Sequence, residues 1–297
     1  MTDPTSFEHK GRMIRAEIAT SATPEQAWEA WADPEKIAQW FVDRATGEAK
    51  PGGTMTWFFD KFGYVLPNKI VDAVPGELVI FQWEAPEAIP RILEVRIARE
   101  GGTTTVRLIN SGFREDAAWD EEYEGVNSGW KMALAILKFY LENYFARAKS
   151  AILIIRPAKF TYEEVLKYFL DADKLAQWLT TAGAIGKLGD ACELQLRDAG
   201  KLTGSVLAIT SREVTVSWYE IGGVLELKAF SMGPQRVVCL RGYSWRLNAE
   251  EIAKIENKMS AAVDRLAALF PLSAAASDAS LSAQTRRRLK NSLKEKL

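Results

Sequence analysis

Apolar and polar residues alternate in the first half of the chain with the period of two that is typical of β-strands. The first such run is Met13 to Thr20, and later runs follow it, separated by turns that contain glycine or proline. We expect neighbouring runs to pair as an antiparallel meander. The later runs are Thr54 to Asp60, Leu66 to Val74, Glu77 to Glu84, Pro90 to Arg99 and Thr103 to Gly112.

Two short helices are predicted between the first run and the second. Thr23 to Glu25 is a helix start, because the threonine hydroxyl caps free N–H groups and proline fits the first helical position. Asp33 and Pro34 repeat this signal. The second helix has its apolar residues on one face, and these are Ile37, Trp40 and Phe41.

A long helix is predicted after the last run. From Trp119 to about Arg147 the apolar period becomes helical. A sheet with one apolar face needs a cover, and this helix is long enough to provide it. The pattern therefore predicts an α+β unit in which a curved antiparallel sheet wraps around a long C-terminal helix. The residues on the helix stripe are Trp130, Leu134, Leu137 and Leu141.

The second half of the chain repeats this plan. The segment from Asp33 to Phe41 recurs 138 residues later as Asp171 to Leu179, and the second copy also ends in a predicted helix, Ala249 to Phe270. We therefore predict two tandem domains, 11–148 with intact motifs and 151–271 as a divergent repeat. A flexible basic tail, 272–297, follows them.

Composition changes this picture little. A length of 297 residues suits two domains of roughly 100–150 residues each. The net charge of -1 gives no reason to expect a nucleic-acid partner. No apolar run is long enough for a transmembrane segment, and no signal peptide is evident, so we expect a cytoplasmic protein.

Histidine and cysteine limit the chemistry. His9 is the one histidine, and we expect it in a disordered leader, which leaves both copies without a histidine base, a Ser-His-Asp triad or a histidine-ligated metal. Cys192 and Cys239 have no metal-ligand spacing and fall on the third and last strands of the second copy. We expect them to be small buried apolar residues without a disulfide, and we expect no metal or other cofactor.

The first copy combines motifs that are weak alone and specific together. They are Thr23-Pro24-Glu25 leading to Trp28, Asp33 to Ile37 with Trp40-Phe41, the Pro51-Gly52-Gly53 turn, Val74-Pro75 with Leu78 to Trp83, and Gly129-Trp130 with Leu134, Leu137, Tyr140 and Leu141. This combination, spread over residues 12 to 145, resembles the START-like (SRPBCC) superfamily and, within it, the activator-of-heat-shock-protein-90-ATPase branch. The second copy keeps Asp171 to Leu179 and Trp218 but lacks the Pro-Gly-Gly turn and the Gly-Trp pair.

The resemblance implies a helix-grip (START-like) fold with a cavity between sheet and terminal helix. Three functions follow, in order of preference. The first is non-enzymatic binding of a small hydrophobic ligand in the first domain. The second is a co-chaperone-like module of the stress response that binds or activates a heat-shock-protein-90-type ATPase. The third is a cyclase-like or hydrolase-like enzyme that uses carboxylates and tyrosines.

The residues expected around the first cavity come from the second helix, the concave face of the sheet and the closing helix. Such pockets are mostly aromatic with few polar groups. The alternative is that these side chains only pack against one another, as aromatic residues do in ordinary cores. They are Trp40, Phe41, Trp57, Phe59, Trp83, Leu93, Val95, Tyr123, Trp130 and Leu134.

Polar groups give two further hypotheses. Asp60, Glu84, Asn110 and Arg114 are either polar anchors of that cavity or exposed turn and strand-end residues. In the basic tail, leucines spaced by four suggest either a short amphipathic helix that docks on an acidic partner or anionic surface, or a solvated frayed terminus.

Overall fold

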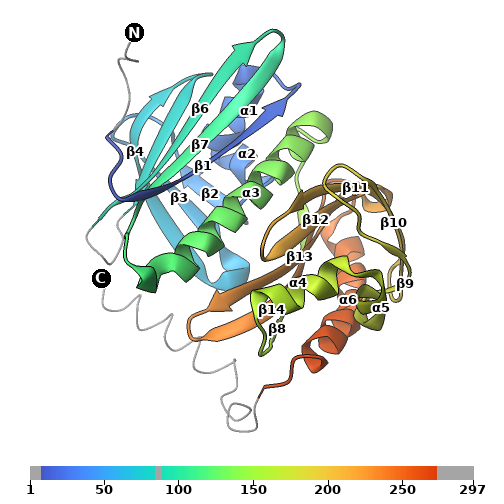
Figure 1. The fold of residues 1–297 in the computed structure, drawn as a ribbon. Helices are drawn as coiled ribbons and strands as arrows, with labels where there is room; N and C mark the ends of the chain where they lie inside the picture. Colours follow the sequence, from blue (N-terminus) through green and yellow to red (C-terminus); the bar gives the residue numbers. More distant parts are fainter. Residues whose placement is uncertain (1–7, 84–88, 273–297) are drawn as a thin grey trace. The chain divides into compact units, whose positions relative to one another are not determined.

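A computed structural model describes residues 8–83 and 89–272, and its first unit is a helix-grip domain. Its strands form one antiparallel sheet in the order β1-β7-β6-β5-β4-β3-β2. Figure 1 shows α3 lying along this sheet. The strands are β1 (Arg12–Thr20), β2 (Arg44–Gly47), β3 (Thr54–Phe59), β4 (Tyr64–Val74), β5 (Leu78–Trp83), β6 (Arg91–Glu100) and β7 (Thr103–Phe113), and the helices are α1 (Pro24–Ala32), α2 (Pro34–Ala38) and α3 (Asp120–Asn143).

The second unit repeats this architecture. Its strands pair in the order β8-β14-β13-β12-β11-β10-β9. This is the strand order of the first sheet with seven added to each strand number. The predicted α+β helix-grip fold in tandem copies is therefore confirmed. The strands are β8 (Ser150–Pro157), β9 (Thr180–Ala184), β10 (Ala191–Leu196), β11 (Gly200–Ile209), β12 (Glu213–Trp218), β13 (Gly223–Met232) and β14 (Gln235–Ser244), and the helices are α4 (Tyr162–Leu170), α5 (Ala172–Trp178) and α6 (Ala249–Ala268).

Side-chain caps start the short helices. Thr23 accepts a hydrogen bond from the backbone N–H of Gln26, whose side chain accepts one from the backbone N–H of Thr23. Thr161 and Glu164 form the same capping box at the start of α4. Asp33 caps α2 through the N–H groups of Glu35 and Lys36. The predicted helix starts are thus confirmed.

The structure adds one strand to each meander, β2 in the first unit and β9 in the second. Both are short and mostly exposed, so the apolar pattern gives no sign of them. Each strand has, near its C-terminal end, a glycine with positive φ that pairs with the next strand. It is Gly47 in β2 and Gly183 in β9. A Cβ at Gly47 would lie 2.0 Å from the carbonyl oxygen of Thr54, and one at Gly183 would lie 2.1 Å from that of Glu193. These hairpins therefore require glycine.

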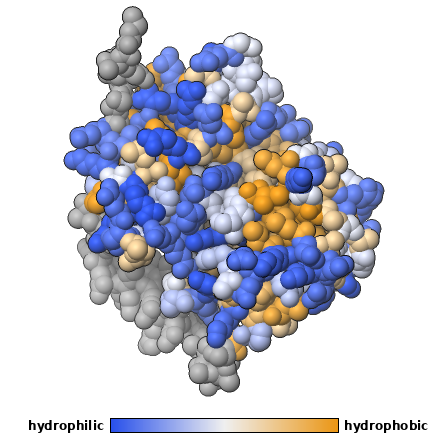
Figure 2. Space-filling view, viewed as in Figure 1, coloured by the Kyte–Doolittle hydropathy of each residue, from blue (hydrophilic) through white to orange (hydrophobic). Residues whose placement is uncertain are grey.

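The main boundary between two compact units falls between Ala148 and Lys149, with Lys61–Tyr64 grouped with the second unit. Each unit supplies the strands of its own sheet. Among the described helices, none is long and apolar enough to cross a membrane. Figure 2 shows hydrophilic residues over much of the face in view, with hydrophobic residues gathered over the β12 and β13 part of the second unit.

Candidate functional site

An aromatic cluster occupies the first unit where α1, the end of α2, the sheet and α3 meet. The ring of Phe41, just after α2, stacks on Trp130 of α3 with ring centroids 5.4 Å apart. Phe41 also meets Trp57 of β3 edge-on at 5.6 Å, and it lies 6.4 Å from Trp31 of α1. The remaining ring contacts are Phe41 with Trp40 and Phe59, Trp31 with Trp40 and Trp130, and Trp57 with Phe81.

Exposure within this cluster is uneven. Trp31, Trp40, Trp57 and Trp130 are all buried. Phe41, which lies among them, is only half-buried. The residue that contacts all four buried indoles is therefore itself partly accessible to solvent.

Hydrogen bonds fix two of these indoles. Trp130 Nε1 donates to Asn110 Oδ1 on β7 at 2.9 Å, and Asn110 Nδ2 donates to the carbonyl oxygen of Ile92. Trp40 Nε1 donates to the carbonyl oxygen of Ala30 at 2.7 Å. Trp31 Nε1 and Trp57 Nε1 are also buried, but neither has a hydrogen-bond partner among the described residues. Buried indole N–H groups usually find an acceptor.

The structure brings together half of the predicted site residues as this cluster. Trp40, Phe41, Trp57, Phe59 and Trp130 are in ring contact with one another directly or through Phe41. The aliphatic candidates are fully buried core residues on β6 and α3, and these are Leu93, Val95 and Leu134.

Two predicted site residues lie apart from the ring contacts of the cluster. Tyr123, in the first turn of α3, packs edge-on against Phe113 and donates its hydroxyl to the carbonyl oxygen of Met13. Arg12 covers its other side, with the guanidinium 4.0 Å from the ring centroid. Tyr123 is therefore tied to the edge of the sheet. Trp83 is half-buried at the end of β5.

The four polar candidates separate by burial. Asn110 is buried and holds Trp130, as described above. Asp60 pairs with Arg44, and Arg114 pairs with Asp116, and all four of these side chains are exposed. Glu84 lies outside the described residues, as does the tail beyond Leu272. Asn110 is thus the one described candidate that lies in the core beside the cluster.

Sequence reasoning missed Trp31, Phe81 and Asn68. Trp31 could have been found, because Ala27, Ala30 and Trp31 follow the i, i+3, i+4 pattern of a buried helix face. Asn68 lies on β4, in the inward register with Ile70, and both are fully buried. A polar residue at an inward strand position is the signal that would have marked it.

The second unit keeps a hydrogen bond that supports this cluster but has different residues at two of the cluster's positions. Trp178 Nε1 donates to the carbonyl oxygen of Tyr168, which repeats the bond from Trp40 to Ala30 138 residues later. At the same offset, Phe169 replaces Trp31 and Leu179 replaces Phe41. Leu179 is fully buried. The counterpart of the half-buried Phe41 is therefore a buried aliphatic residue in a closed core.

The expectation for His9 is wrong. His9 packs on the sheet, with Nδ1 2.9 Å from Ser111 Oγ and Nε2 3.1 Å from Glu94 Oε2. Glu94 is a buried carboxylate that also pairs with Arg96, and burying a charge requires such partners. The order serine, histidine, glutamate is that of a hydrolytic triad. Ser111, however, is 0% exposed, so its hydroxyl is out of reach of a substrate and the arrangement clamps the N-terminal segment.

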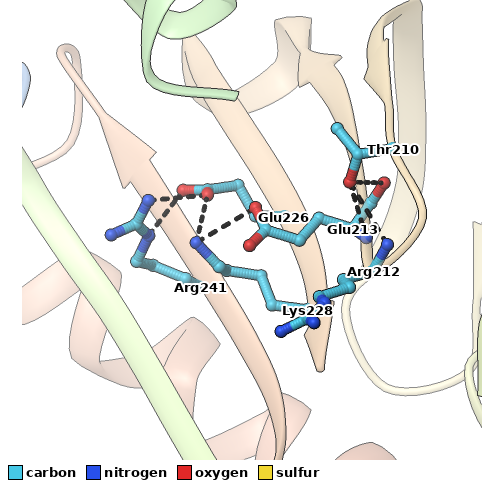
Figure 3. Close-up of polar contacts among 6 residues, drawn as sticks. All are labelled: Thr210, Arg212, Glu213, Glu226, Lys228 and Arg241. Carbon is cyan, nitrogen blue, oxygen red and sulfur yellow. Dashed lines mark hydrogen bonds and ion pairs between the residues drawn. The ribbon is translucent and has the colours of Figure 1, made fainter. Parts of the chain in front are cut away.

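A buried charge network lies in the second unit on the sheet face opposite α6. Leu225 and Leu227 belong to the core, so Glu226 between them faces the other way. Figure 3 shows Glu226 accepting both guanidinium hydrogen bonds of Arg241, each 2.7 Å long, with Lys228 bridging Glu226 and Glu213. Burial alone raises the pKa of Glu226, but Arg241 and Lys228 outweigh it, so the pKa lies below its usual value.

The loop beside that network is held by Thr210. Its hydroxyl accepts hydrogen bonds from the backbone N–H groups of Arg212 and Glu213, as Figure 3 also shows. The two acids and two bases of the network balance in charge, and each carboxylate has a basic partner. We therefore interpret the network as a structural ion cluster. Its charged groups are already paired with one another and are not available to bind a substrate.

The cysteines are free and buried, as predicted. Burial raises the pKa of the Cys192 thiol to about 11 and that of Cys239 to about 12, so both stay protonated near neutral pH. Within residues 8–83 and 89–272, no three His, Cys, Asp or Glu side chains are grouped so that they could hold a metal ion.

The family comparison agrees with the position of the cluster. Residues 21–142 match the family model described as activator of Hsp90 ATPase homolog 1-like protein. The first unit contains a domain of this family. This AHSA1-like domain includes all five rings from Trp31 to Trp130 that surround or contact Phe41. No curated protein sequence matches the chain.

Solved structures resemble either the AHSA1-like domain or most of the chain. The Aha1 dimer from Colwellia psychrerythraea is 22% identical, with a TM-score of 0.40, over 44% of this chain and 96% of that one. The di-domain ARO/CYC protein BexL is 10% identical, with a TM-score of 0.42, over 88% of this chain and 99% of that one. DynU16, from the dynemicin biosynthetic locus, is 14% identical, with a TM-score of 0.39, over 86% of this chain and 98% of that one. At these values the activities named for those proteins are not transferred to this chain.

Proposed function

We propose that the AHSA1-like domain binds a small hydrophobic ligand at the aromatic cluster between the sheet and α3, without catalysing a reaction on it. The observation that carries the proposal is Phe41. A large ring at the centre of four buried indoles is normally shielded from water, yet Phe41 is half-buried. A ligand that stacked against it would remove apolar surface from water, which stabilises a complex.

The second unit supports the choice of domain. Where the first unit has Phe41, the second has the fully buried Leu179, and where the first has Trp31, the second has Phe169. Leu179 and Phe169 belong to one buried core, so a flat aromatic ligand would meet a closed core. We therefore expect one occupied site per chain, in the first unit.

The absence of catalysis rests on the side chains around the cluster. Asn110, which is occupied by Trp130 and Ile92, is not an acid or a base, and neither is the buried amide of Asn68. In the buried network of the second unit, the acid and base groups are paired with one another. Binding without chemistry is the function that these residues support.

Two measurements test the proposal. Native mass spectrometry of the purified full chain, before and after solvent extraction, should show a bound mass that extraction removes. Titration with the neutral fluorescent probe N-phenyl-1-naphthylamine should then saturate at one site per chain. Phe41→Leu, which copies the second unit, should weaken probe binding at least tenfold, because it removes the aromatic ring on which the probe would stack.

Leu179→Met is the matched control in the second unit, since it keeps the volume of a buried aliphatic residue. It should leave probe binding unchanged. Saturation at two sites per chain, or equal sensitivity to the two substitutions, would contradict the assignment to the first unit. No probe binding by the extracted protein would contradict ligand binding itself.

A co-chaperone module is the second candidate, and the family match of residues 21–142 favours it. A chaperone activator must bind two conformations of its partner with different affinity, since only differential binding shifts an ATPase cycle. We expect the host's own heat-shock-protein-90 homologue to change its ATPase rate less than about twofold, or roughly 0.4 kcal/mol of barrier, when the protein is added. A several-fold stimulation that is lost on deleting residues 273–297 would reverse this ranking.

A further inference from the structure

Three buried polar side-chain atoms of uncharged residues in the first unit have no hydrogen-bond partner among the described residues. They are Trp31 Nε1, Trp57 Nε1 and Asn68 Oδ1. The three residues are 0%, 1% and 0% exposed. Leaving such groups unpaired costs stability, and native proteins rarely do so without a reason. Three of them in one small domain therefore point to a shared cause.

Both indoles flank the same ring. Phe41 lies 6.4 Å from Trp31 and 5.6 Å from Trp57, measured between ring centroids. Other indoles of the same domain are satisfied, since Trp28 donates to the carbonyl oxygen of Leu78 and Trp40 to that of Ala30. Trp40 and Trp130 also contact Phe41, and their indoles are hydrogen-bonded. Both unpaired indoles thus lie beside the half-buried Phe41.

Asn68 adds an acceptor beside them. Its Nδ2 donates to the carbonyl oxygens of Met55 and Leu66, both at 3.0 Å. Two carbonyl partners fix which end of the amide carries the hydrogens, so Oδ1 is the end without a partner. Met55 and Trp57 share the inward face of β3, and Asn68 has the inward register on β4. The acceptor therefore lies in the same inward-facing layer as the indole of Trp57.

The second unit lacks this polar set. Phe169 stands at the position of Trp31, and its ring has no N–H. The inward residues of β10 are Cys192, Leu194 and Leu196, and those of β11 begin with Leu202 and Gly204. None of these carries the indole or amide of the first unit. The second unit does contain one buried hydroxyl without a hydrogen-bond partner among the described residues, Thr180 Oγ1. The combination of two indole donors and one amide acceptor is thus specific to the first unit.

Two donors and one acceptor are the complement of a hydroxyl group, which offers two lone pairs and one O–H. The surrounding rings favour a flat apolar body. We propose that the ligand of the AHSA1-like domain is a hydroxylated aromatic compound. Its oxygen accepts hydrogen bonds from Trp31 and Trp57, and its O–H donates to Asn68 Oδ1. Either one hydroxyl group or two neighbouring oxygens make these three bonds. This inference rests on the proposed function and names the class of ligand.

The test measures discrimination between two compounds of the same shape. 2-Naphthol and 2-methylnaphthalene would each displace N-phenyl-1-naphthylamine from the full chain, and the ratio of their displacement constants reports the hydroxyl contribution. Trp31→Phe and Trp57→Phe keep a ring and remove the N–H. Each should reduce the preference for 2-naphthol about threefold to tenfold, as expected for one neutral hydrogen bond, and the double variant should reduce it further.

Stability provides the second readout. In the ligand-free protein, Trp31→Phe and Trp57→Phe remove an unpaired donor, so their melting temperatures should stay equal or rise after allowing for the smaller ring. Trp28→Phe is the matched control, because it removes an indole N–H that donates to Leu78 in the same domain. It should lower the melting temperature and leave the preference ratio unchanged.

The outcomes separate this inference from the proposed function. If both compounds displace the probe and the ratio is the same in wild type and in the Trp31 and Trp57 variants, ligand binding stands and the hydroxyl assignment is wrong. If those variants lose as much stability as Trp28→Phe with no change in ratio, the indoles have partners within the protein and the assignment is again wrong. If the extracted protein binds no probe, both proposals fail together.

Discussion

Trp130 on α3 and Asn110 on β7 join the long helix to the strand next to the edge of the first sheet through one hydrogen bond of 2.9 Å. Asn110 is held in turn by the backbone of β6, through the carbonyl oxygen of Ile92. The bond therefore fixes the rotation of α3 at the point where Trp130 stacks on Phe41. Packing and orientation of the proposed site depend on the same residue.

Trp130→Ala should destabilise the first unit by about 3–5 kcal/mol, because it removes a buried indole and leaves a cavity. Probe binding at the first unit should be lost as well. Trp130→Phe keeps most of the packing but leaves Asn110 Oδ1 without its donor, at a cost of about 1–3 kcal/mol. Urea unfolding of the full chain measures both effects. Lys131→Ala, at the exposed neighbouring position, is the control and should change neither stability nor binding.

The two units should fold separately. Each sheet takes its strands from one unit, and the main boundary falls after Ala148. Fragments 1–148 and 150–272 should each give the circular dichroism of a mixed α and β protein and a cooperative thermal transition. An unfolded 1–148 fragment would show that the first unit depends on the second.

Acid should weaken the second unit through Glu226. Its pKa is lowered in the folded state, so it contributes stability that is complete above the unfolded value of about 4.3 and is lost as pH falls through the lower folded value. Arg241→Met removes the bidentate partner and leaves a buried charge, which should cost about 3–5 kcal/mol. Urea unfolding at pH 7 and pH 3 checks both statements.

Glu193→Gln is the control for Glu226, because the pair that it forms with Lys201 in the same unit is exposed on both sides. It should have little effect, as exposed ion pairs contribute little. A loss for Glu193→Gln equal to that for Arg241→Met would mean that burial does not determine the strength of these pairs.

His9→Ala should destabilise the first unit although His9 precedes the first strand. The substitution removes partners from Ser111 and from the buried carboxylate of Glu94, with an expected cost of about 1–3 kcal/mol. Glu8→Ala, at the exposed neighbouring position, tests whether the effect is specific. Equal stability of His9→Ala and wild type in urea would show that the clamp contributes nothing.

Local sequence signals predicted the parts of the fold that depend on neighbouring residues. The cap at Thr23, the helix start at Asp33 and the stripe that carries Trp130 need only short-range spacing, so they could be read directly. The repeat of Trp40 as Trp178 came from the same kind of comparison, and the shared hydrogen bond confirms it.

Long-range contacts explain what the sequence did not reveal. His9 and Glu94 are 85 residues apart in the sequence, and no local pattern around His9 indicates that partner. Strand β2 has no apolar alternation and exists because Arg44 to Gly47 pair with β3. Asn68 has a local signal, a polar residue at an inward strand position, but the carbonyl group of Met55 that holds its amide comes from β3. Each of these features is defined by a partner that only the folded chain supplies.

The second unit has the buried Leu179 at the position of Phe41, so its melting temperature can serve as an internal reference for that of the first unit. A ligand that binds one native domain raises the melting temperature of that domain with ligand concentration, following RT ln(1 + [L]/Kd). The closed core around Leu179 in the second unit should show no such dependence. Calorimetry of the full chain should then show one transition that moves with added ligand and one that stays in place, so a compound library could be screened without labels and without knowing the natural ligand.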